Sequence, residues 1–323
     1  MKKNTKTIDY QDKAAGCLIG LAIGDAFGDA ARDPENQFLY GITMDFPEKE
    51  TGSTDDTEFA LLTAEILIRT GGKPAPEDVL AAWKEHVVVQ DELRRGGASE
   101  REAAANIRNG LTAPDSGRYN AFSYTDGAAM RSAPAGIVAA GNVNRAMELA
   151  RVDAEISHDR DGIWGAQAVA AAVAVAMESG SLDEILDAAQ QCAPPDSWFY
   201  HSLKRCFDLL DHYDNKLEKA WMPLHQILRC ENKAAVPEAV TSALAIFRLT
   251  DGNFEKGILY SGNFGRDSDT IGAVVGAISG ALHGLKAIPQ NWVDKVRKPS
   301  GTCLNFTRGK DLIHMATDLA KLI

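Results

Sequence analysis

Two short acidic segments, far apart in the chain, carry the residues best suited to metal-assisted chemistry. The first reads Ser53-Thr54-Asp55-Asp56-Thr57-Glu58 and the second reads Arg266-Asp267-Ser268-Asp269-Thr270. Each supplies two carboxylates and a threonine hydroxyl, hard oxygen ligands that suit Mg²⁺, Mn²⁺ or Ca²⁺ and do not suit zinc or copper. Four carboxylates around one point would repel one another without cations, so we expect two metal ions that orient a substrate and activate water.

The first acidic segment also has a purely structural interpretation. Asp55 can cap the helix that follows it, and Glu58, three residues further on, would complete a capping box. Two adjacent carboxylates exceed what a cap requires, because one oxygen satisfies one free backbone N–H. The residues alone leave both interpretations open.

The second acidic segment needs a particular backbone to act as a metal site. On a regular helix Asp267 and Thr270 share a face, whereas Asp269 points away from them. Convergence of the three therefore requires an irregular turn, which Gly262 and Gly265 make feasible. A capped turn with solvated aspartates is the structural alternative.

The elements that must position these segments are helices. Apolar residues recur at helical spacing along most of the chain, and alternating β-branched or aromatic runs bounded by turns are missing. No Pro/Ser/Gly-rich linker or charge block divides the chain, so we predict one all-α domain over residues 1–323. The predicted helices cover residues 11–31, 55–70, 76–89, 100–109, 127–140, 144–157, 162–178, 182–191, 197–213, 237–249, 267–283 and 311–322.

Two of the predicted helices carry glycines at every fourth position. One set is Gly16, Gly20, Gly24 and Gly28, and the other is Gly272, Gly276, Gly280 and Gly284. Glycine inside a helix costs roughly 0.5–1 kcal/mol relative to alanine, so a repeated pattern indicates a compensating gain. We expect these faces to allow close backbone approach at the centre of the bundle.

Composition excludes several classes of partner. The formal net charge of −11 argues against non-specific nucleic-acid binding, which requires a basic face. The first thirteen residues lack the apolar segment of a secretion signal, and the most apolar run, residues 169–177, is too short to cross a bilayer. Five scattered cysteines without a C-x-x-C motif are typical of reduced thiols. We expect a cytoplasmic protein with neither nucleic-acid nor membrane partners.

Five blocks of the sequence resemble the ADP-ribosylglycohydrolase family, which includes dinitrogenase reductase-activating glycohydrolases and ADP-ribosyl-acceptor hydrolases. The blocks are residues 16–28 (GCLIGLAIGDAFG), 53–58 (STDDTE), 126–131 (DGAAMR), 157–158 (SH) and 265–272 (GRDSDTIG). They occur in the family's order and extend from about residue 13 to 285. The ordered set is a strong signal, whereas any one block is a moderate one.

The resemblance implies an orthogonal all-α bundle with a binuclear Mg²⁺ centre in a central cleft. The implied reaction is hydrolysis at the anomeric carbon of a ribose through an oxocarbenium-like transition state. The ions would fix the ribose and lower the pKa of the attacking water, and nearby carboxylates, Asp56 and Asp269 among them, would manage protons. The implied metal ligands are Thr54, Asp55 and Asp56 for one ion and Asp267, Asp269 and Thr270 for the other, with Asp269 bridging.

One position departs from the family's pattern. The family places a glutamate shortly after the Gly-Asp-x-x-Gly block, where it contacts a metal-linked water or the substrate, and Arg32 stands there in this chain. Among the neighbouring carboxylates we assign the catalytic role of that glutamate to Asp33, with Glu35 and Asp29 as alternatives. A different leaving group, or loss of activity, would also accommodate Arg32.

The 126–131 and 157–158 blocks match segments that line the substrate cleft in the family. The resemblance implies substrate contacts by Asp126, Gly127, Met130, Arg131 and His158. Asp126 can instead be a helix cap, Arg131 can pair with a structural carboxylate, and His158 can interact with a helix C-terminus.

The function we predict is Mg²⁺-dependent hydrolysis of an ADP-ribosyl, or related ribosyl, glycosidic bond. The substrate would be an ADP-ribosylated protein or a small ribosylated molecule. A nucleoside-type N-ribohydrolase or a two-metal phosphohydrolase would use the same oxygen-rich site. A non-catalytic protein that binds ADP-ribose is the third alternative, and Arg32 is the residue that supports it.

Overall fold

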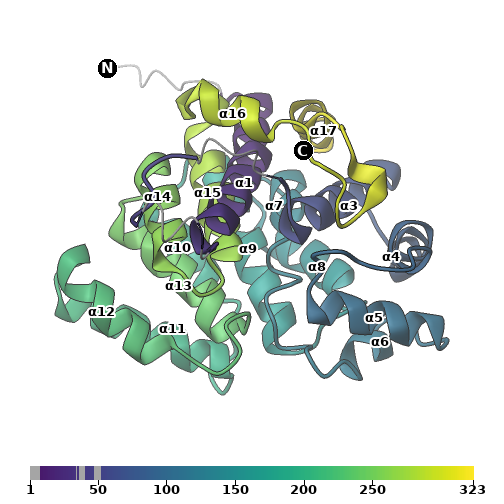
Figure 1. Cartoon of the computed structure of the whole chain (residues 1–323), viewed down its shortest axis with the longest axis horizontal. Helices are drawn as coiled ribbons and strands as arrows, with labels where there is room; N and C mark the ends of the chain where they lie inside the picture. Colours follow the sequence, from purple (N-terminus) through teal and green to yellow (C-terminus); the bar gives the residue numbers. More distant parts are fainter. Residues whose placement is uncertain (1–7, 34, 36–40, 47–51) are drawn as a thin grey trace.

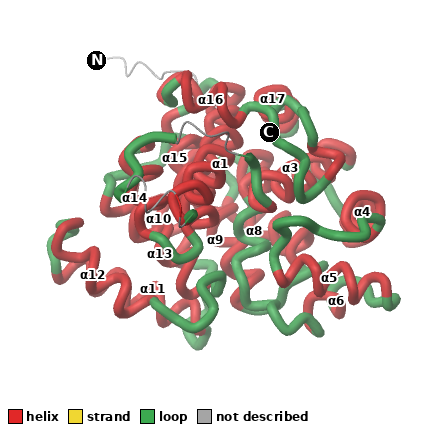
Figure 2. The backbone as a smooth tube through the Cα atoms, in the orientation of Figure 1, coloured by secondary structure: helices red, strands yellow, loops and turns green. Residues whose placement is uncertain are grey.

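The computed structural model describes residues 8–33, 35, 41–46 and 52–323. Within these residues every regular element is a helix, and the extended pairing is confined to one isolated bridge between Thr125 and Ala235. Figures 1 and 2 show the helices packed around a central pair, joined by loops. The all-α prediction is therefore confirmed. Of the polar N-terminal segment, residues 1–7 lie outside the described residues.

The helices extend over most of the described chain. They are α1 (Tyr10–Arg32), α3 (Asp55–Arg69), α4 (Pro76–Trp83), α5 (Ala98–Arg108), α6 (Asp115–Arg118), α7 (Ala133–Val138), α8 (Val143–Ala154), α9 (Asp161–Met177), α10 (Leu182–Gln190), α11 (Trp198–His212), α12 (Leu217–Leu228), α13 (Val236–Leu249), α14 (Phe254–Phe264), α15 (Ser268–His283), α16 (Gln290–Val296) and α17 (Leu312–Ala320). A π-helix, Lys84–Val88, continues α4, and short 3₁₀ turns occupy Leu285–Ala287 and Asn305–Thr307.

Helices α1 and α15 pack backbone to backbone at the centre of the molecule (Figure 1). A Cβ atom added to Gly20 would lie 2.1 Å from the Gly276 carbonyl oxygen, and one added to Gly24 would lie 1.9 Å from that of Gly272. Only glycine permits such an approach, so the prediction made from the two glycine sets is confirmed. Gly284 is the exception, because it ends α15 at a φ of 81°.

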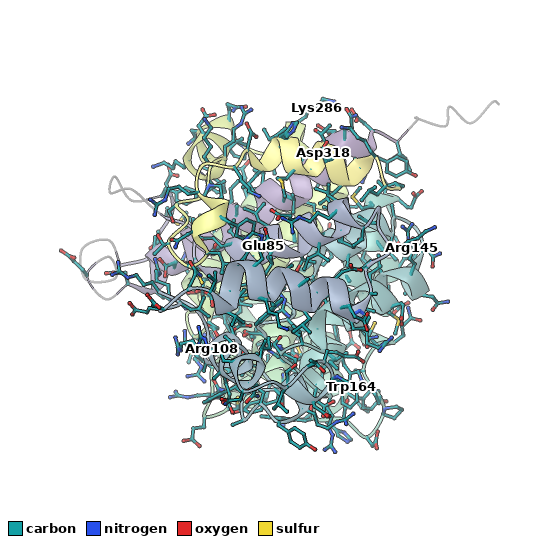
Figure 3. The ribbon with its side chains drawn as sticks, turned by 90° about the vertical axis from the view of Figure 1, so that its right-hand side faces the viewer. Glu85, Arg108, Arg145, Trp164, Lys286 and Asp318 are labelled. Carbon is teal, nitrogen blue, oxygen red and sulfur yellow. The ribbon has the colours of Figure 1, made fainter. Side chains whose placement is uncertain are left out.

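Helix α1 is a core helix. Among the described residues it is the helix whose length and mean hydropathy would suffice to cross a membrane, but 94% of its apolar window is buried inside the fold. Helices α3, α7, α9, α14, α16 and α17 pack around it. Charged side chains such as Glu85 and Arg145 project from the outer surface instead (Figure 3).

Lys13 ties the central pair to a third helix. Its ammonium is buried and donates 2.8 Å hydrogen bonds to the carbonyl oxygens of Ala176 in α9 and of Ala281 and Leu282 in α15. The Ala281 and Leu282 carbonyls belong to the last turn of α15, where intrahelical donors run out. The Ala176 carbonyl also accepts from the Ser179 N–H. The substitution Lys13→Met keeps the apolar stem but removes the buried donor from all three carbonyls. We expect the free energy of unfolding to fall by about 3 kcal/mol.

Urea denaturation followed by circular dichroism measures the Lys13→Met effect. The exposed Lys286, which pairs with Asp9 at the surface, is the control, and Lys286→Met should cost less than about 1 kcal/mol. Equal losses for the two variants would contradict the role given to Lys13.

The helix predicted over residues 127–140 was too long. Only Ala133–Val138 is helical, and the preceding residues form turns. Asp126 donates its backbone N–H to the Ala234 carbonyl, and the Gly127 carbonyl accepts from the Arg131 guanidinium. In a helix the Gly127 carbonyl would accept from the Arg131 backbone N–H, but here it accepts from the Arg131 side chain, and the segment forms turns.

Candidate active site

Thr54 begins helix α3, and a buried carboxylate fixes its orientation. Asp25, on α1 and fully buried, accepts hydrogen bonds from the Thr54 N–H at 3.0 Å and the Thr54 hydroxyl at 2.6 Å. It also accepts from the Thr57 N–H and hydroxyl. Burial raises the pKa of Asp25, and these hydrogen bonds oppose the rise. Because the Thr54 hydroxyl gives its proton to Asp25 and accepts from the Asp56 N–H, one lone pair of its oxygen remains.

The capping box that the first acidic segment suggested is wrong. The N-cap is Thr54, whose side chain accepts from the Asp56 N–H. Glu58 turns away from the helix start and accepts hydrogen bonds from the backbone N–H groups of Cys303 and Leu304, at 3.0 and 2.6 Å. Glu58 therefore anchors the C-terminal loop, and the carboxylates of Asp55 and Asp56 are not used in capping.

Asp55 and Asp56 are buried at the start of α3. Burial, reinforced by Glu100, raises the pKa of Asp55 to about 8. Burial also raises the pKa of Asp56, with Asp269 as the largest charged contributor. Among the described residues, Asp56 Oδ1 has no hydrogen-bond partner. Ionised carboxylates buried in this way are unfavourable without a compensating cation.

The second acidic segment enters α15 through an irregular turn, as convergence requires. Gly265 and Arg266 have positive φ values of 73° and 60°, and Asp267 is a non-helical N-cap whose side chain makes no capping hydrogen bond. One detail differs from the sequence prediction. Gly262 lies inside α14, where it packs against the ring of Phe27, and is not part of the turn.

The two acidic segments meet in one cleft of about 830 Å³. Asp55 and Asp56 come from α3, and Asp267, Asp269 and Thr270 come from the start of α15. Thr54 is buried behind this wall and does not line the cleft. The carboxyl side chains that line it and are buried are Asp55, Asp56, Glu100, Asp126, Asp267 and Asp269.

Cationic side chains already pair with the second acidic segment. Arg32, the last residue of α1, donates to Asp267 Oδ1 at 3.0 Å and to both carboxylate oxygens of Asp269. Lys233 Nζ lies 2.7 Å from the same oxygen of Asp267. Burial raises the pKa of Asp269 and Asp267 adds to the rise, whereas Arg32 opposes it.

The donor chemistry of the cleft fits hard divalent cations, but the side chains are not preassembled around one point. The carboxylate and hydroxyl oxygens suit Mg²⁺ or Mn²⁺. Within the part of the chain that the structure describes, however, no group of three His, Cys, Asp or Glu side chains is arranged to hold a metal ion. Arg32 fills part of the space between Asp267 and Asp269. Asp56 Oδ1 and Asp126 Oδ2 are buried beside this cleft, without a hydrogen-bond partner in the described part of the chain.

A loop across the cleft positions Asp126, Gly127 and Met130, which all line it. The Asp126 N–H bonds to the Ala234 carbonyl at 2.8 Å, and the Val236 N–H bonds to the Tyr124 carbonyl at 3.1 Å. Asp126 Oδ2 is buried and has no hydrogen-bond partner among the described residues. Burial, followed by the charges of Asp267 and Asp269, raises the pKa of Asp126.

Arg131 and His158 lie behind the cleft wall and do not line it. Arg131 is 1% exposed, and its guanidinium bonds to Asp153, Glu100, Ser157 and the Gly127 carbonyl, which uses all its donors. His158 is equally buried, and burial lowers the pKa of its imidazole. Both side chains are placed to support the loop that carries Asp126, and neither reaches the cleft in this structure.

Asp33, the proposed substitute for the missing glutamate, is exposed at the C-terminal end of α1. Its carboxylate accepts from the Glu35 N–H at 2.8 Å and does not line the cleft. Arg32, which stands where the family has its glutamate, is the residue that enters the cleft. Arg32, and not Asp33, therefore contacts the acidic cluster.

Several residues at the site escaped the sequence analysis. Glu100 lines the cleft between Gly97 and Gly127, at both of which an added Cβ would clash with its carboxylate. Lys233 and Arg95 supply positive charge, and Tyr124 and Trp198 form an aromatic pair at a centroid distance of 6.2 Å. Among these residues the sequence marks only Glu100, at the start of a predicted helix, and there it is indistinguishable from an ordinary helix-start glutamate.

Comparison with known proteins is consistent with this geometry. A protein of Archaeoglobus fulgidus is 30% identical over 305 residues, covering 89% of this chain and 92% of its own length. The ADP-ribosylarginine hydrolase Tri1 of Pseudomonas putida is 25% identical over 298 residues, which cover 88% of this chain and 74% of Tri1. A solved structure titled ADP-ribosylglycohydrolase-related protein complex superposes with a TM-score of 0.66 at 25% identity. The superposition covers 97% of this chain and 99% of the chain in that structure.

The profile of one family matches nearly the whole chain, over residues 6–323, and its description is ADP-ribosylglycohydrolase. The matched range includes both acidic segments, the loop at Asp126 and the central glycine-packed helices. With the fold, the cleft and the relatives in agreement, the chain belongs to the ADP-ribosylglycohydrolase family.

Proposed function

We propose that this chain is an Mg²⁺-dependent hydrolase that cleaves the glycosidic bond between ADP-ribose and its acceptor. Membership of the family supports a glycohydrolase that acts on ADP-ribosyl linkages. The observation that carries the finer proposal is the shared cleft, beside which Asp56 and Asp126 each keep a buried oxygen without a partner among the described residues. Such oxygens are suited to a cation and to ribose hydroxyls.

The proposed centre holds two divalent ions, Mg²⁺ or Mn²⁺, with the first on the α3 side of the cleft. Bound there, the ions would neutralise the carboxylates, orient the ribose diol and lower the pKa of a water molecule. Asp25 would serve this centre by accepting the Thr54 hydroxyl proton, which leaves one lone pair of that oxygen for a metal ion. The proposed ligands are Thr54, Asp55 and Asp56 for the first ion and Asp267, Asp269 and Thr270 for the second.

The cleft residues around this centre suit the remaining parts of an ADP-ribosyl group. Asp126 Oδ2 is placed to accept from a ribose hydroxyl, and Gly127 keeps the adjacent wall free of side-chain bulk. Lys233 and Arg95 supply positive charge for a diphosphate. We propose an ADP-ribosylated protein or small molecule as substrate, with arginine as the first acceptor to test because Tri1 is named for that linkage.

Product analysis distinguishes this proposal from its alternatives. The protein is incubated with Mg²⁺ and ADP-ribosyl-arginine, ADP-ribosyl-serine, a simple nucleoside or a phosphomonoester. We expect the protein to release ADP-ribose from an ADP-ribosylated substrate. Release of a free base would establish an N-ribohydrolase instead, and release of phosphate a phosphohydrolase. Binding of ADP-ribose without turnover of any substrate would establish a non-catalytic relative.

Removal of divalent cations should abolish turnover reversibly. Within residues 8–33, 35, 41–46 and 52–323, no ion pair involves the carboxylates on the α3 side, so without metal the cleft lacks the charge that holds a ribose diol and activates water. We expect hydrolysis of ADP-ribosyl-arginine to fall at least about 100-fold after dialysis against a chelator, and to return on addition of Mg²⁺ or Mn²⁺. Full activity in the chelated protein would contradict the metal requirement.

A further inference from the structure

Arg32 divides the acidic cluster into two halves with different charge balance. Its guanidinium lies 3.0 Å from Asp267 Oδ1 and bonds to both carboxylate oxygens of Asp269. Lys233 adds a second positive charge at Asp267. The α15 half, defined as Asp267 and Asp269, is thus already neutralised by side chains of the protein itself.

The α3 half, defined as Asp55 and Asp56, has no such compensation. None of the ion pairs in the described part of the chain involves either carboxylate, and Asp56 Oδ1 is buried without a hydrogen-bond partner. Asp126, across the same cleft, also keeps one buried oxygen unpartnered. A cation that binds here therefore breaks no ion pair among the described residues.

A guanidinium and a divalent ion cannot use the same carboxylate oxygens. An ion at the α15 half must remove Arg32 from Asp269, where both oxygens are engaged, and must tolerate Lys233 beside Asp267. Charge-assisted hydrogen bonds of this kind are about twice as strong as neutral ones, so the exchange has a large free-energy cost. An ion at the α3 half carries no such cost.

Asp29 is an alternative ion-pair partner for Arg32. It lies one turn earlier on α1, and its Oδ1 already accepts from Arg32 Nη2 at 3.2 Å. Arg95 pairs with the same carboxylate and holds it at the edge of the cleft. Arg32 can leave Asp269 while it retains Asp29 as a partner.

We propose that Arg32 is a built-in counter-cation that makes the two metal positions unequal, so that the second ion binds only by displacing the guanidinium from Asp267 and Asp269. The inference rests on the proposed metal centre and adds an order of loading to it. The first ion occupies the α3 half while Arg32 stays in place. The second competes with Arg32, which moves to Asp29.

Titration of the metal-free protein with Mn²⁺, followed by the electron paramagnetic resonance signal of free Mn²⁺, tests this order without reference to turnover. In the wild-type protein we expect one tight equivalent and a second that binds about 100-fold more weakly. In Arg32→Gln, which removes the positive charge and keeps a polar side chain, the second equivalent should bind within about tenfold of the first. At two equivalents this variant should also show the spin-coupled spectrum of ions about 3.5–4 Å apart.

Two further variants serve as controls. Arg95→Gln removes a positive charge from the same cleft but no bond to Asp267 or Asp269, so the wild-type inequality should persist. Arg32→Lys retains a cation, and the second equivalent should stay the weaker one. If Arg32→Gln proves unfolded by circular dichroism, Arg32→Ala takes its place with the same expected result, because it also removes the guanidinium.

Two results would overturn the inference in distinguishable ways. A second equivalent that stays about 100-fold weaker in Arg32→Gln, or two equivalents of equal affinity in the wild-type protein, would eliminate the role of Arg32 and leave the proposed metal centre intact. No Mn²⁺ binding by the wild-type protein or by any variant would remove the metal centre, and the order of loading with it.

Discussion

Asp269→Asn and Asp56→Asn each lower kcat/KM for ADP-ribosyl hydrolysis by about 1,000-fold or more, while the protein stays folded. The amide keeps the volume of the carboxylate but removes the charge that a divalent ion requires. A loss of this size is expected when one preorganised electrostatic contact is removed from a water-excluded site. Steady-state kinetics with ADP-ribosyl-arginine at saturating Mg²⁺ measures it.

Asp56→Asn should not lose stability, because burial and neighbouring carboxylates raise the pKa of Asp56 and disfavour its charged form in the metal-free fold. A neutral amide at this position removes the repulsion, and the metal-free melting temperature of Asp56→Asn should be unchanged or higher. Asp269→Asn also gives up the ion pair with Arg32, so its melting temperature should lie below that of Asp56→Asn. Asp208, an exposed carboxylate on α11 paired with Lys204, is the matched control, and Asp208→Asn should change neither quantity. Wild-type turnover by either cleft variant would contradict the assignment.

Gly24→Ala should prevent folding or lower the free energy of unfolding by more than about 4 kcal/mol. The new Cβ would lie 1.9 Å from the Gly272 carbonyl oxygen, a backbone atom in the middle of α15 that no side-chain rotation can move away. Elsewhere in a helix the same substitution is stabilising by roughly 0.5–1 kcal/mol. The packing of α1 on α15 therefore reverses the sign of the effect.

Soluble yield and urea denaturation followed by circular dichroism measure the Gly24→Ala effect. Gly52→Ala is the control, because the nearest atom to its added Cβ is the Ser300 hydroxyl at an ordinary distance of 3.6 Å. A stable Gly24→Ala protein that melts with the wild type would show that the two helices are not packed as closely as the structure has them.

Much of the architecture could be predicted because the spacing of the glycines reports both where the central helices lie in the sequence and how they pack. Glycines at every fourth position identified both central helices and their contact. The missed helices lack a favourable local signal. Helix α12 contains Pro223, which usually interrupts a helix, and α14 contains Gly257 and Gly262. Contact with α1 and α15 stabilises α14, and sequence periodicity does not report such tertiary packing.

The site was predictable where residue type alone constrains chemistry. Paired carboxylates close to a threonine, in the segments that contain Asp55 and Asp269, indicated a hard-cation site. Both segments line one cleft. The direction in which a side chain points depends on tertiary structure. Nothing in the sequence shows that Arg32 turns into the cleft, or that Arg131 is buried behind it among Asp153 and Glu100.

The most direct test of the central claim is a crystal structure determined after soaking in a high concentration of Mn²⁺ with ADP-ribose. We predict anomalous density within about 2.5 Å of carboxylate oxygens of Asp56 and Asp269, with the ribose diol facing it and Asp126 beside the sugar. Manganese and ADP-ribose bound elsewhere on the molecule, with neither of them in this cleft, would contradict the account.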